Sequence, residues 1–338
     1  IIFEENIVEK NRGDGVVFDN RSVGSLLFKN NQVKENQRSG VYFDHHRGDV
    51  EVVGNTVEGN SGRGLRIYKY ENEGSSNKGE EAYRYSSEKI LIKGNIVKNN
   101  KGWDGNNDTS SETGISVYYR SNAKVQVLDN VVEGEAGYGL RVENDREGVF
   151  GEVRGNVVKS NGGIGLRTYG KLLPLVSGNT FEGNGNGMQL VYTDLNTSGA
   201  FEVSGNAIRN SGGYGVRIEQ YAQPSINGND LDGSGGYAID NQTALAINAK
   251  NNWWGDAITQ EMTTGANPKN LIKVYDSYDD SNKGFVNYGG WLDGTALDPD
   301  NPPSAIQMER GTVTLTKSDG AATTTYQAGD KVYISLKD

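Results

Sequence analysis

The sequence predicts an all-β fold, a right-handed parallel β-helix of about ten coils, from three observations. A Gly-Asn corner, or a close variant of it, recurs along the chain with a basic spacing near 23 residues. Apolar residues stand at fixed positions before and after the corner Asn. Short alternating segments rich in β-branched residues separate the corners, and we find no segment with a helical period. One coil cannot bury its own apolar face, so the copies are expected to stack into a rod.

The corner Asn anchors each coil. The anchors are Asn6, Asn31, Asn55, Asn95, Asn130, Asn156, Asn179, Asn206, Asn229 and Asn252. The residue three before each anchor and the residue two after it are apolar in all ten coils, from Phe3 and Val8 to Ala249 and Trp254. We expect the anchors to tolerate left-handed backbone at the corner and to stack their amides in a ladder, which is a structural role.

A second polar corner follows five residues after most anchors, and a Gly then opens a further strand. This corner holds Asn11, Asn36, Asn60, Asn100, Asn161 and Asn184. Residues two and four after the Gly should face outward. Position two carries Arg66, Ser116, Arg141, Arg167, Gln189 and Arg217. Position four carries Asp19, Asp44, Tyr68, Tyr118, Glu143, Tyr169, Glu219 and Asp240. Stacking at about 4.8 Å places an Arg stripe beside a carboxylate and Tyr stripe.

These stripes have two interpretations. Arg141, Arg167 and Tyr169 are candidate ligand-binding residues, because Arg pairs well with the carboxylates of an anionic glycan. The alternative, which we favour, is a solvated ladder in which carboxylates neutralise the stacked Arg residues, since like charges opposed on a sheet are unfavourable.

Composition excludes several classes of function. The 338 residues contain no Cys, two His and three Met, which excludes a disulfide framework and thiol chemistry. The net charge of −10 argues against nucleic-acid binding, which needs clustered Lys and Arg. No apolar run approaches the roughly 20 residues of a membrane span. The chain starts inside a repeat without a signal peptide, so we interpret it as a piece of a longer exported polypeptide, extracellular or at the cell surface, with the periplasm as the alternative.

Two long insertions interrupt the regular spacing. They cover Tyr68–Glu88 and Lys101–Thr113, and we expect them to project close together because they leave neighbouring coils. Their aromatic residues, Tyr68, Tyr70, Tyr83, Tyr85 and Trp103, are candidate ligand-binding residues. Aromatic faces among hydrogen-bonding neighbours suit sugar rings and equally a protein contact. The alternative is that the Tyr residues only pin the loops to the rod.

Catalytic residues are harder to assign. Asp44, His46, Glu143 and Arg167 are the candidates, with His46 as a base or metal ligand beside Asp44. Elimination beside a uronate needs an Arg or Lys base, and hydrolysis needs two carboxylates at a defined separation. We assign no such carboxylate pair. Adjacent residues on an extended segment point in opposite directions, which argues against a joint site around His46.

The repeat ends at Asn251–Gly255, and a C-terminal cap is expected at about 253–292, with Trp253 and Trp254 as a lid over the rod end. Asp276, Asp279, Asp280 and Asn282 concentrate oxygen ligands that suit Ca²⁺, and the alternative is a capping turn held by Asx hydrogen bonds.

The remaining residues divide into a linker, 293–304, and a segment, 305–338, that is a β-hairpin or the start of a truncated β-sandwich. Its strands, Thr312–Thr316 and Lys331–Leu336, would also be able to complete a sheet in a neighbouring subunit and so form a homo-oligomer or filament.

The Gly-Asn coils, the Asn251–Gly255 motif NNWWG and the segment VYDSYDDSNKGFVNYGGWL up to Leu292 together resemble a known family. This is the family of parallel β-helix-repeat proteins of bacterial and archaeal surfaces and periplasm, related in fold to pectate lyases. The resemblance implies the fold over residues 1–292 and leaves the activity open, because the fold serves lyases, glycosidases, adhesins and surface-layer proteins.

Two functions follow as hypotheses. The first is a non-catalytic cell-surface module, a surface-layer, adhesin or filament component, that binds polysaccharide or neighbouring surface-protein subunits. The second is a polysaccharide lyase or glycoside hydrolase that acts on an acidic polysaccharide. The shortage of catalytic chemistry makes us lean toward the first.

Overall fold

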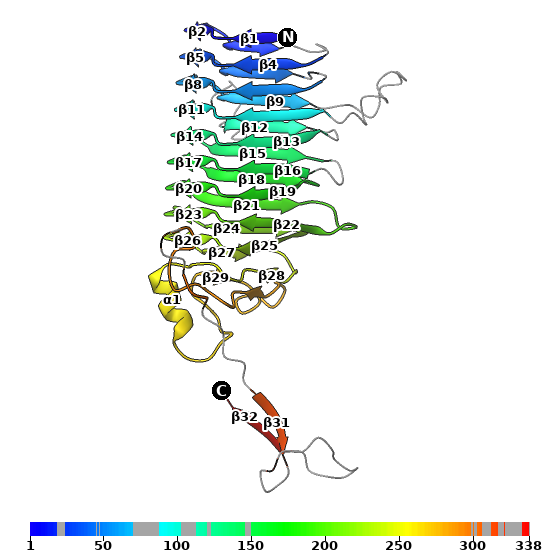
Figure 1. Ribbon diagram of the computed structural model, residues 1–338, viewed down its shortest axis with the longest axis vertical. Helices are drawn as coiled ribbons and strands as arrows, with labels where there is room; N and C mark the ends of the chain where they lie inside the picture. The colour runs from blue at the N-terminus through cyan, green and yellow to red at the C-terminus, as the bar shows by residue number, and fades with distance from the viewer. Residues whose placement is uncertain are drawn as a thin grey trace.

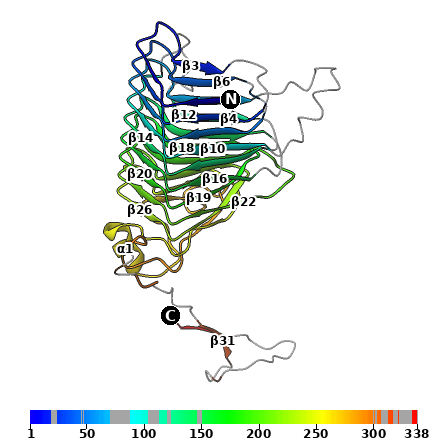
Figure 2. The same cartoon turned by 45° about the horizontal axis from the view of Figure 1, so that its top comes forward.

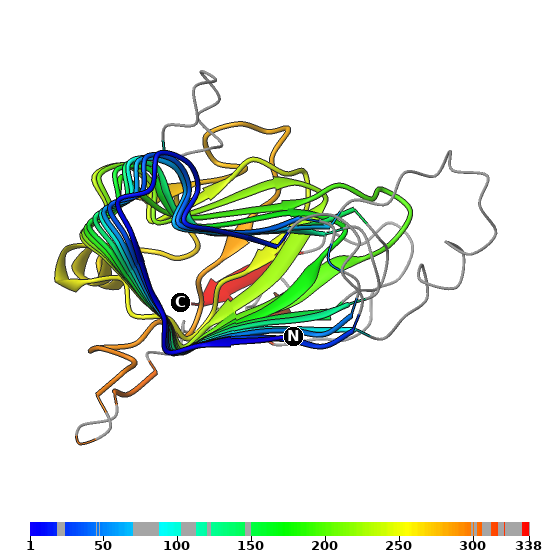
Figure 3. The ribbon, with the colours of Figure 1, turned by 90° about the horizontal axis from the view of Figure 1, so that it is seen from above.

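The computed structural model describes residues 1–18, 24–44, 46, 48–69, 88–102, 113–119, 123–145, 150–298, 300, 303–305, 312–316, 321 and 333–337. Three long parallel sheets run the length of the rod, and the coils stack one on another along the long axis (Figures 1 and 2). Viewed from above, successive coils superimpose around a common interior (Figure 3). The predicted parallel β-helix is confirmed.

Each coil contributes one strand to each sheet. The first sheet contains β1 (Ile2–Glu4), β4 (Leu26–Lys29), β7 (Val50–Val53), β10 (Lys89–Lys93), β13 (Lys124–Leu128), β16 (Phe150–Arg154), β19 (Leu173–Ser177), β22 (Gly199–Ser204), β25 (Ala222–Asn227), β28 (Ile247–Asn248) and β30 (Val286–Asn287). The second contains β2 (Ile7–Glu9), β5 (Gln32–Lys34), β8 (Thr56–Glu58), β11 (Ile96–Lys98), β14 (Val131–Glu133), β17 (Val157–Lys159), β20 (Thr180–Glu182), β23 (Ala207–Arg209) and β26 (Asp230–Asp232). The third contains β3 (Val16–Phe18), β6 (Val41–Asp44), β9 (Leu65–Lys69), β12 (Thr113–Tyr119), β15 (Tyr138–Asn144), β18 (Ile164–Gly170), β21 (Asn186–Tyr192), β24 (Val216–Gln220), β27 (Ile239–Asn241) and β29 (Val274–Tyr275).

The coil count differs slightly from the expected ten. Within the described residues the three sheets contain 11, 9 and 10 strands, so only nine coils are complete. Beyond the ninth coil the first sheet continues with β28 and β30, and the third with β29. The rod therefore ends gradually.

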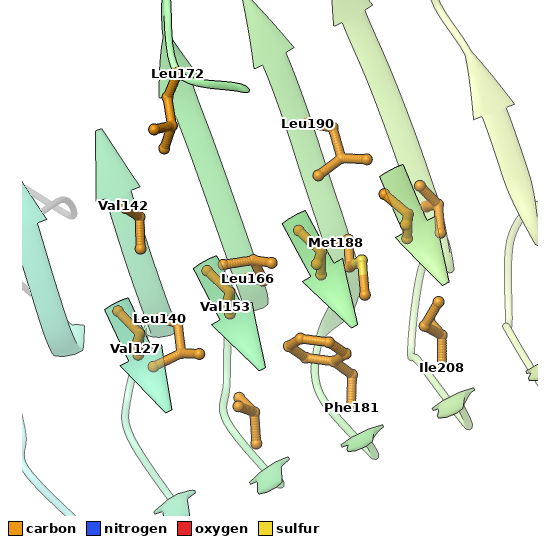
Figure 4. Close-up of a cluster of buried hydrophobic side chains, with 14 of the residues drawn as sticks. Val127, Leu140, Val142, Val153, Leu166, Leu172, Phe181, Met188, Leu190 and Ile208 are labelled. Carbon is orange, nitrogen blue, oxygen red and sulfur yellow. The ribbon is translucent and has the colours of Figure 1, made fainter. Parts of the chain in front are cut away.

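The apolar residues that flank each anchor fill the interior. Val153 and Val158, on either side of Asn156, are 1% and 0% exposed. In Figure 4 the side chains of neighbouring coils, such as Val127 and Val153, lie side by side on successive strands. Burial of each such side chain stabilises the fold by about 1.5–3 kcal/mol. The first coil is the exception, because Phe3 and Val8 have a neighbour on one side and are only partly buried.

The anchor amides form the expected ladder. Asn130 donates its backbone N–H and its side-chain amide to Oδ1 of Asn156, at 3.0 and 2.9 Å. Asn156 does the same to Asn179 and also donates to the Val127 carbonyl at 2.9 Å. The expectation of left-handed backbone at the anchor itself was wrong. The left-handed residue precedes the anchor, as at Gly155 with φ of 68°, which explains why Gly stands there so often.

A second ladder runs along the other polar corner and contains one carboxyl group. Asn60 donates to Asn100 at 2.9 Å, and Asn100 donates to Oε1 of Glu135 at 3.1 Å. Glu135 is 2% exposed, and its Oε2 has no hydrogen-bond partner among the described residues. Burial raises the pKa of this carboxyl to about 8, against the opposing effect of the Asn100 hydrogen bond. The next member of the ladder, Asn161, is uncharged.

The second sheet displays charges of alternating sign on its outer side. The residues that face one another from coil to coil are Glu9, Lys34, Glu58, Lys98, Glu133, Lys159, Glu182, Arg209 and Asp232. Glu133 lies 3.8 Å from Lys98 and 3.5 Å from Lys159, so one carboxylate serves both neighbours. Stacking therefore brings opposite charges together at every step of this row.

The cap contains a helix that the sequence analysis missed. α1 (Asp256–Thr263) follows the last anchor, and its Ile258 and Met262 join the core cluster that includes Trp254 and Trp291. Lys273 donates to the carbonyls of Ser234, Gly235 and Gly236 at 3.0 Å each. The ammonium group therefore donates hydrogen bonds to carbonyl oxygens at the end of the rod. In a longer rod, the next coil would bind these oxygens. Within the described residues, no helix is long and apolar enough to cross a membrane.

Residues just beyond the cap contact the second sheet of the rod. Asp230, fully buried on the second sheet, accepts from the Ala296 backbone N–H at 2.6 Å and pairs with Arg209 and the Thr295 hydroxyl. Leu292 also pairs with Ala305, so the predicted linker 293–304 closes into a loop. Further on, β31 (Thr312–Thr316) and β32 (Tyr333–Lys337) pair antiparallel with each other and join none of the three long sheets (Figure 1).

We expect Asn156→Ala to lower the free energy of unfolding by about 2–3 kcal/mol, because it leaves the buried backbone N–H of Asn130 without its acceptor and the Val127 carbonyl without the Asn156 amide. Asn6→Ala, at the open end of the same ladder, is the control and should cost less. Chemical denaturation measures both, and equal losses would contradict the importance of ladder burial.

We expect Glu135→Gln to remove a pH dependence of stability. The pKa of Glu135 is raised in the folded chain from the ordinary 4.5 to about 8, so the unfolded chain releases this proton first as the pH rises. The stabilisation is therefore present below pH 4.5 and is lost as the pH rises through about 8. Thermal unfolding of both proteins across this range should show wild type weakening relative to the variant. Parallel curves would show that Glu135 does not titrate in this way.

Candidate functional site

The outer side of the third sheet carries two rows of polar and aromatic side chains. We call them the inner row, Tyr42, Arg66, Ser116, Arg141, Arg167, Gln189, Arg217 and Asp240, and the outer row, Asp44, Tyr68, Tyr118, Glu143 and Tyr169. The register confirms that these residues stack from coil to coil. Asp240 was predicted in the outer row, but it faces Arg217 because Ala238 takes the place of the coil Gly at that level.

In the middle of the sheet, one carboxylate serves two Arg residues. Glu143 lies 2.8 Å from Nε of Arg141 and 2.5 Å from Nη1 of Arg167. The Glu143 side chain is 3% exposed, whereas the side chains of Arg141 and Arg167 are 20% and 19% exposed. Arg167 also donates to Gln189 at 3.0 Å. These contacts are the ones expected of a neutralised ladder.

The carboxyl-terminal part of the inner row is paired in the same way. Arg217 donates to Asp240 at 2.7 Å, and Gln189 donates to Glu219 at 3.2 Å. The Arg217 guanidinium lies 4.4 Å from the centre of the Tyr214 ring. Burial raises the pKa of Tyr214 to about 12, although the charge of Arg217 acts in the opposite direction.

The amino-terminal part is aromatic, and we call Tyr42, Arg66, Tyr68 and Tyr118 the Tyr–Arg stack. The Arg66 guanidinium lies 5.0 Å from the centre of the Tyr42 ring and 4.8 Å from that of Tyr68. Tyr68 stacks on Tyr118 with ring centres 5.4 Å apart and planes 16° apart. All four side chains are half-buried. Tyr42 was missed in the sequence analysis, although it stands two residues after Gly40 and the same spacing would have found it.

The two insertions join the third sheet at opposite ends of its strands. The chain leaves β9 after Lys69, at the carboxyl end of the strand, and it enters β12 at Thr113, at the amino end. β9 and β12 are paired, so the chain leaves and enters the third sheet at opposite ends of neighbouring strands. Whether the insertions project close together, as predicted, lies outside the described residues. The candidates Tyr70, Tyr83, Tyr85 and Trp103 lie outside the described residues.

The candidate base His46 lies apart from the outer rows. It is 4% exposed, and its Nε2 is 2.8 Å from the carbonyl oxygen of Gly24. Together with Tyr68 and Glu88 it lines a small pocket at the corner between the third and first sheets. Asp44 accepts a hydrogen bond from the Tyr42 hydroxyl at 3.0 Å. The contact of His46 with Gly24 and that of Asp44 with Tyr42 do not form the acid–base pair that a catalytic role would require.

The candidate calcium ligands accept hydrogen bonds from the cap backbone. Asp276 accepts from Tyr278 at 2.8 Å and from Val286 at 2.9 Å. Asp280 accepts from the Asn282 backbone at 2.9 Å, which lowers the pKa of the Asp280 carboxyl. Asp279 accepts from the Asp276 backbone at 3.2 Å. No group of three or more His, Cys, Asp or Glu side chains in the described part of the chain is arranged to hold a metal ion. Calcium binding stays a prediction.

Comparison with known proteins supports the fold. The family described as "right handed beta helix region" matches residues 1–76 and 111–254, which is more than half of the chain. No curated protein and no solved structure matches the chain.

We expect Glu143→Ala to lower the free energy of unfolding by about 2–3 kcal/mol, because two stacked guanidinium groups lose their shared carboxylate. Glu133→Ala on the second sheet also removes a carboxylate shared by two cations, but Glu133 is 34% exposed and should cost about 1 kcal/mol or less. Urea denaturation compares the two, and a Glu143 loss no larger than the Glu133 loss would contradict the pairing.

Proposed function

Because the chain belongs to the right-handed beta helix family, whose fold serves many unrelated activities, we propose that it is a non-catalytic cell-surface module that binds glycan on the outer side of its third sheet. The observation that carries this proposal is the Tyr–Arg stack, four half-buried side chains in register on the three paired strands β6, β9 and β12. An extracellular or cell-surface location forms part of the proposal.

The chemistry of the stack suits a sugar chain. Tyr68 and Tyr118 offer aromatic carbon beside hydrogen-bonding groups, which is the combination that sugar rings with apolar faces and hydroxyl edges require. The strands that hold these residues are locked by pairing on both sides, so the side chains are positioned before a ligand arrives. One insertion follows the carboxyl end of β9 and the other precedes the amino end of β12, and long insertions beside a rigid scaffold are where further ligand contacts are expected.

Catalysis is less well supported by the same surface. Glu143 would have to act as an acid or base, yet it is almost fully buried and shared by Arg141 and Arg167. Arg167, the candidate base, would have to lose a proton while paired with a carboxylate that stabilises its charge. The polysaccharide lyase or hydrolase therefore remains the second candidate.

Assembly and calcium binding are separate proposals. The strands β31 and β32 form a two-stranded sheet with both edges available within the described residues, and such an edge suits strand addition by a neighbouring subunit. The Asp276–Asn282 turn supplies the oxygen-rich segment for Ca²⁺.

We expect Tyr118→Ala to weaken glycan binding about tenfold by removing one aromatic surface of the stack. Tyr221→Ala is the matched control, because Tyr221 is 42% exposed and lies at a corner away from the stack. Affinity electrophoresis against a panel of neutral and acidic polysaccharides measures the effect.

Wild-type protein that binds none of these polysaccharides, or equal loss in both variants, would contradict the proposal. A rise in absorbance from unsaturated product during incubation with a uronate polymer would instead establish the lyase.

A further inference from the structure

Arg66 differs from the other three Arg residues of the inner row in what it contacts. Arg141 and Arg167 share Glu143, and Arg217 pairs with Asp240. Arg66 contacts two aromatic rings, and no carboxylate in the described part of the chain lies within ion-pair distance of it. Among the described residues, it is the guanidinium of this row that contacts aromatic rings and has no carboxylate paired with its charge.

The register explains why Arg66 lacks a carboxylate partner. Its neighbours directly across the sheet are Tyr42 and Ser116, both uncharged. The diagonal neighbour Asp44 accepts the Tyr42 hydroxyl at 3.0 Å. The equivalent diagonal position beside Arg167 is Glu143, and there the ion pair forms. Tyr68 occupies the position beside Arg66 where Arg141 has its carboxylate.

The geometry leaves the hydrogen-bonding edge of the guanidinium available. Contact with an aromatic ring is made through the flat face of an Arg side chain, whereas its five N–H donors point outward within the plane. The side chain is half-buried on the outer side of the sheet, so part of it is in contact with solvent. A planar fork of N–H donors matches two oxygens of a carboxylate or a sulfate ester.

We propose that Arg66, held between Tyr42 and Tyr68, is a subsite for an anionic oxygen group carried by a sugar, a carboxylate or a sulfate ester. The inference rests on the proposed glycan binding by the third sheet and adds the charge of the ligand. It also assigns the anion contact to Arg66, at the aromatic end of the inner row. Arg141 and Arg167 are less suited to it, because both form ion pairs with Glu143.

The test compares three polymers with the full chain. One is a polyuronate, the second is the same polymer with its carboxyl groups reduced to alcohols, and the third is a sulfated neutral polysaccharide whose unsulfated form is also measured. The variants are Arg66→Gln and Arg66→Lys. Arg154→Gln is the control, because Arg154 is a 51% exposed Arg paired with Glu152 on the first sheet.

We expect Arg66→Gln to weaken binding of the anionic polymer about tenfold or more and to weaken binding of the neutral polymer by much less. Arg66→Lys should recover part of the loss, since it keeps the charge without the fork, and Arg154→Gln should have no effect. Loss on the polyuronate alone identifies a carboxylate site, and loss on the sulfated polymer alone identifies a sulfate site. Thermal unfolding of each variant checks that the stack remains folded.

The inference is overturned if Arg66→Gln binds the anionic polymers as well as wild type does, or if it loses neutral and anionic polymers equally. Either result leaves the proposed glycan binding in place, because wild type still binds. Wild type that binds none of the polymers overturns the glycan binding and the subsite with it.

Discussion

The structure depends on one constraint, which is that the backbone of each coil finds its hydrogen-bond partners in the coils above and below. A strand of three residues such as Val157–Lys159 has no partner of its own within the coil. The same is true of the buried corner amides, since the Asn156 side chain is satisfied by residues of two other coils. Register is therefore set at every level of the rod at once, and the outward rows inherit their order from it.

The regular part of the fold could be predicted because it repeats. Val153, Asn156 and Val158 occupy positions that recur ten times, so a weak local pattern became a strong one. The helix α1 could not be found in the same way, because its eight residues bury only Ile258 and Met262. Two apolar contacts in a single short segment define no period. The left-handed backbone was assigned one residue too late, since sequence alone shows the pair Gly155-Asn156 without showing which member turns the chain.

The candidate site was predicted in outline and not in its contacts. Spacing placed Arg66, Arg141 and Arg167 in one row, which the strand register confirms. Arg141 pairs with a carboxylate on its own strand, but Arg167 and Arg217 pair with carboxylates on neighbouring strands, and those neighbours are known only once the coils are aligned. For the same reason, the sequence did not reveal the place of Glu135 in the second ladder. Its carboxyl group replaces an Asn amide at this corner, and the recurring Asn pattern has no member there.

The alternating charges of the second sheet have a consequence for how such a rod can change length. Glu133 lies between Lys98 and Lys159, and the signs alternate from Glu9 to Asp232. Removing one coil would bring two like charges face to face across the new junction, whereas removing two neighbouring coils would restore the alternation. Growth or shortening in pairs of coils thus preserves the electrostatic match, and a change by a single coil does not. The charge row of the second sheet therefore favours insertion or deletion of an even number of coils over that of an odd number.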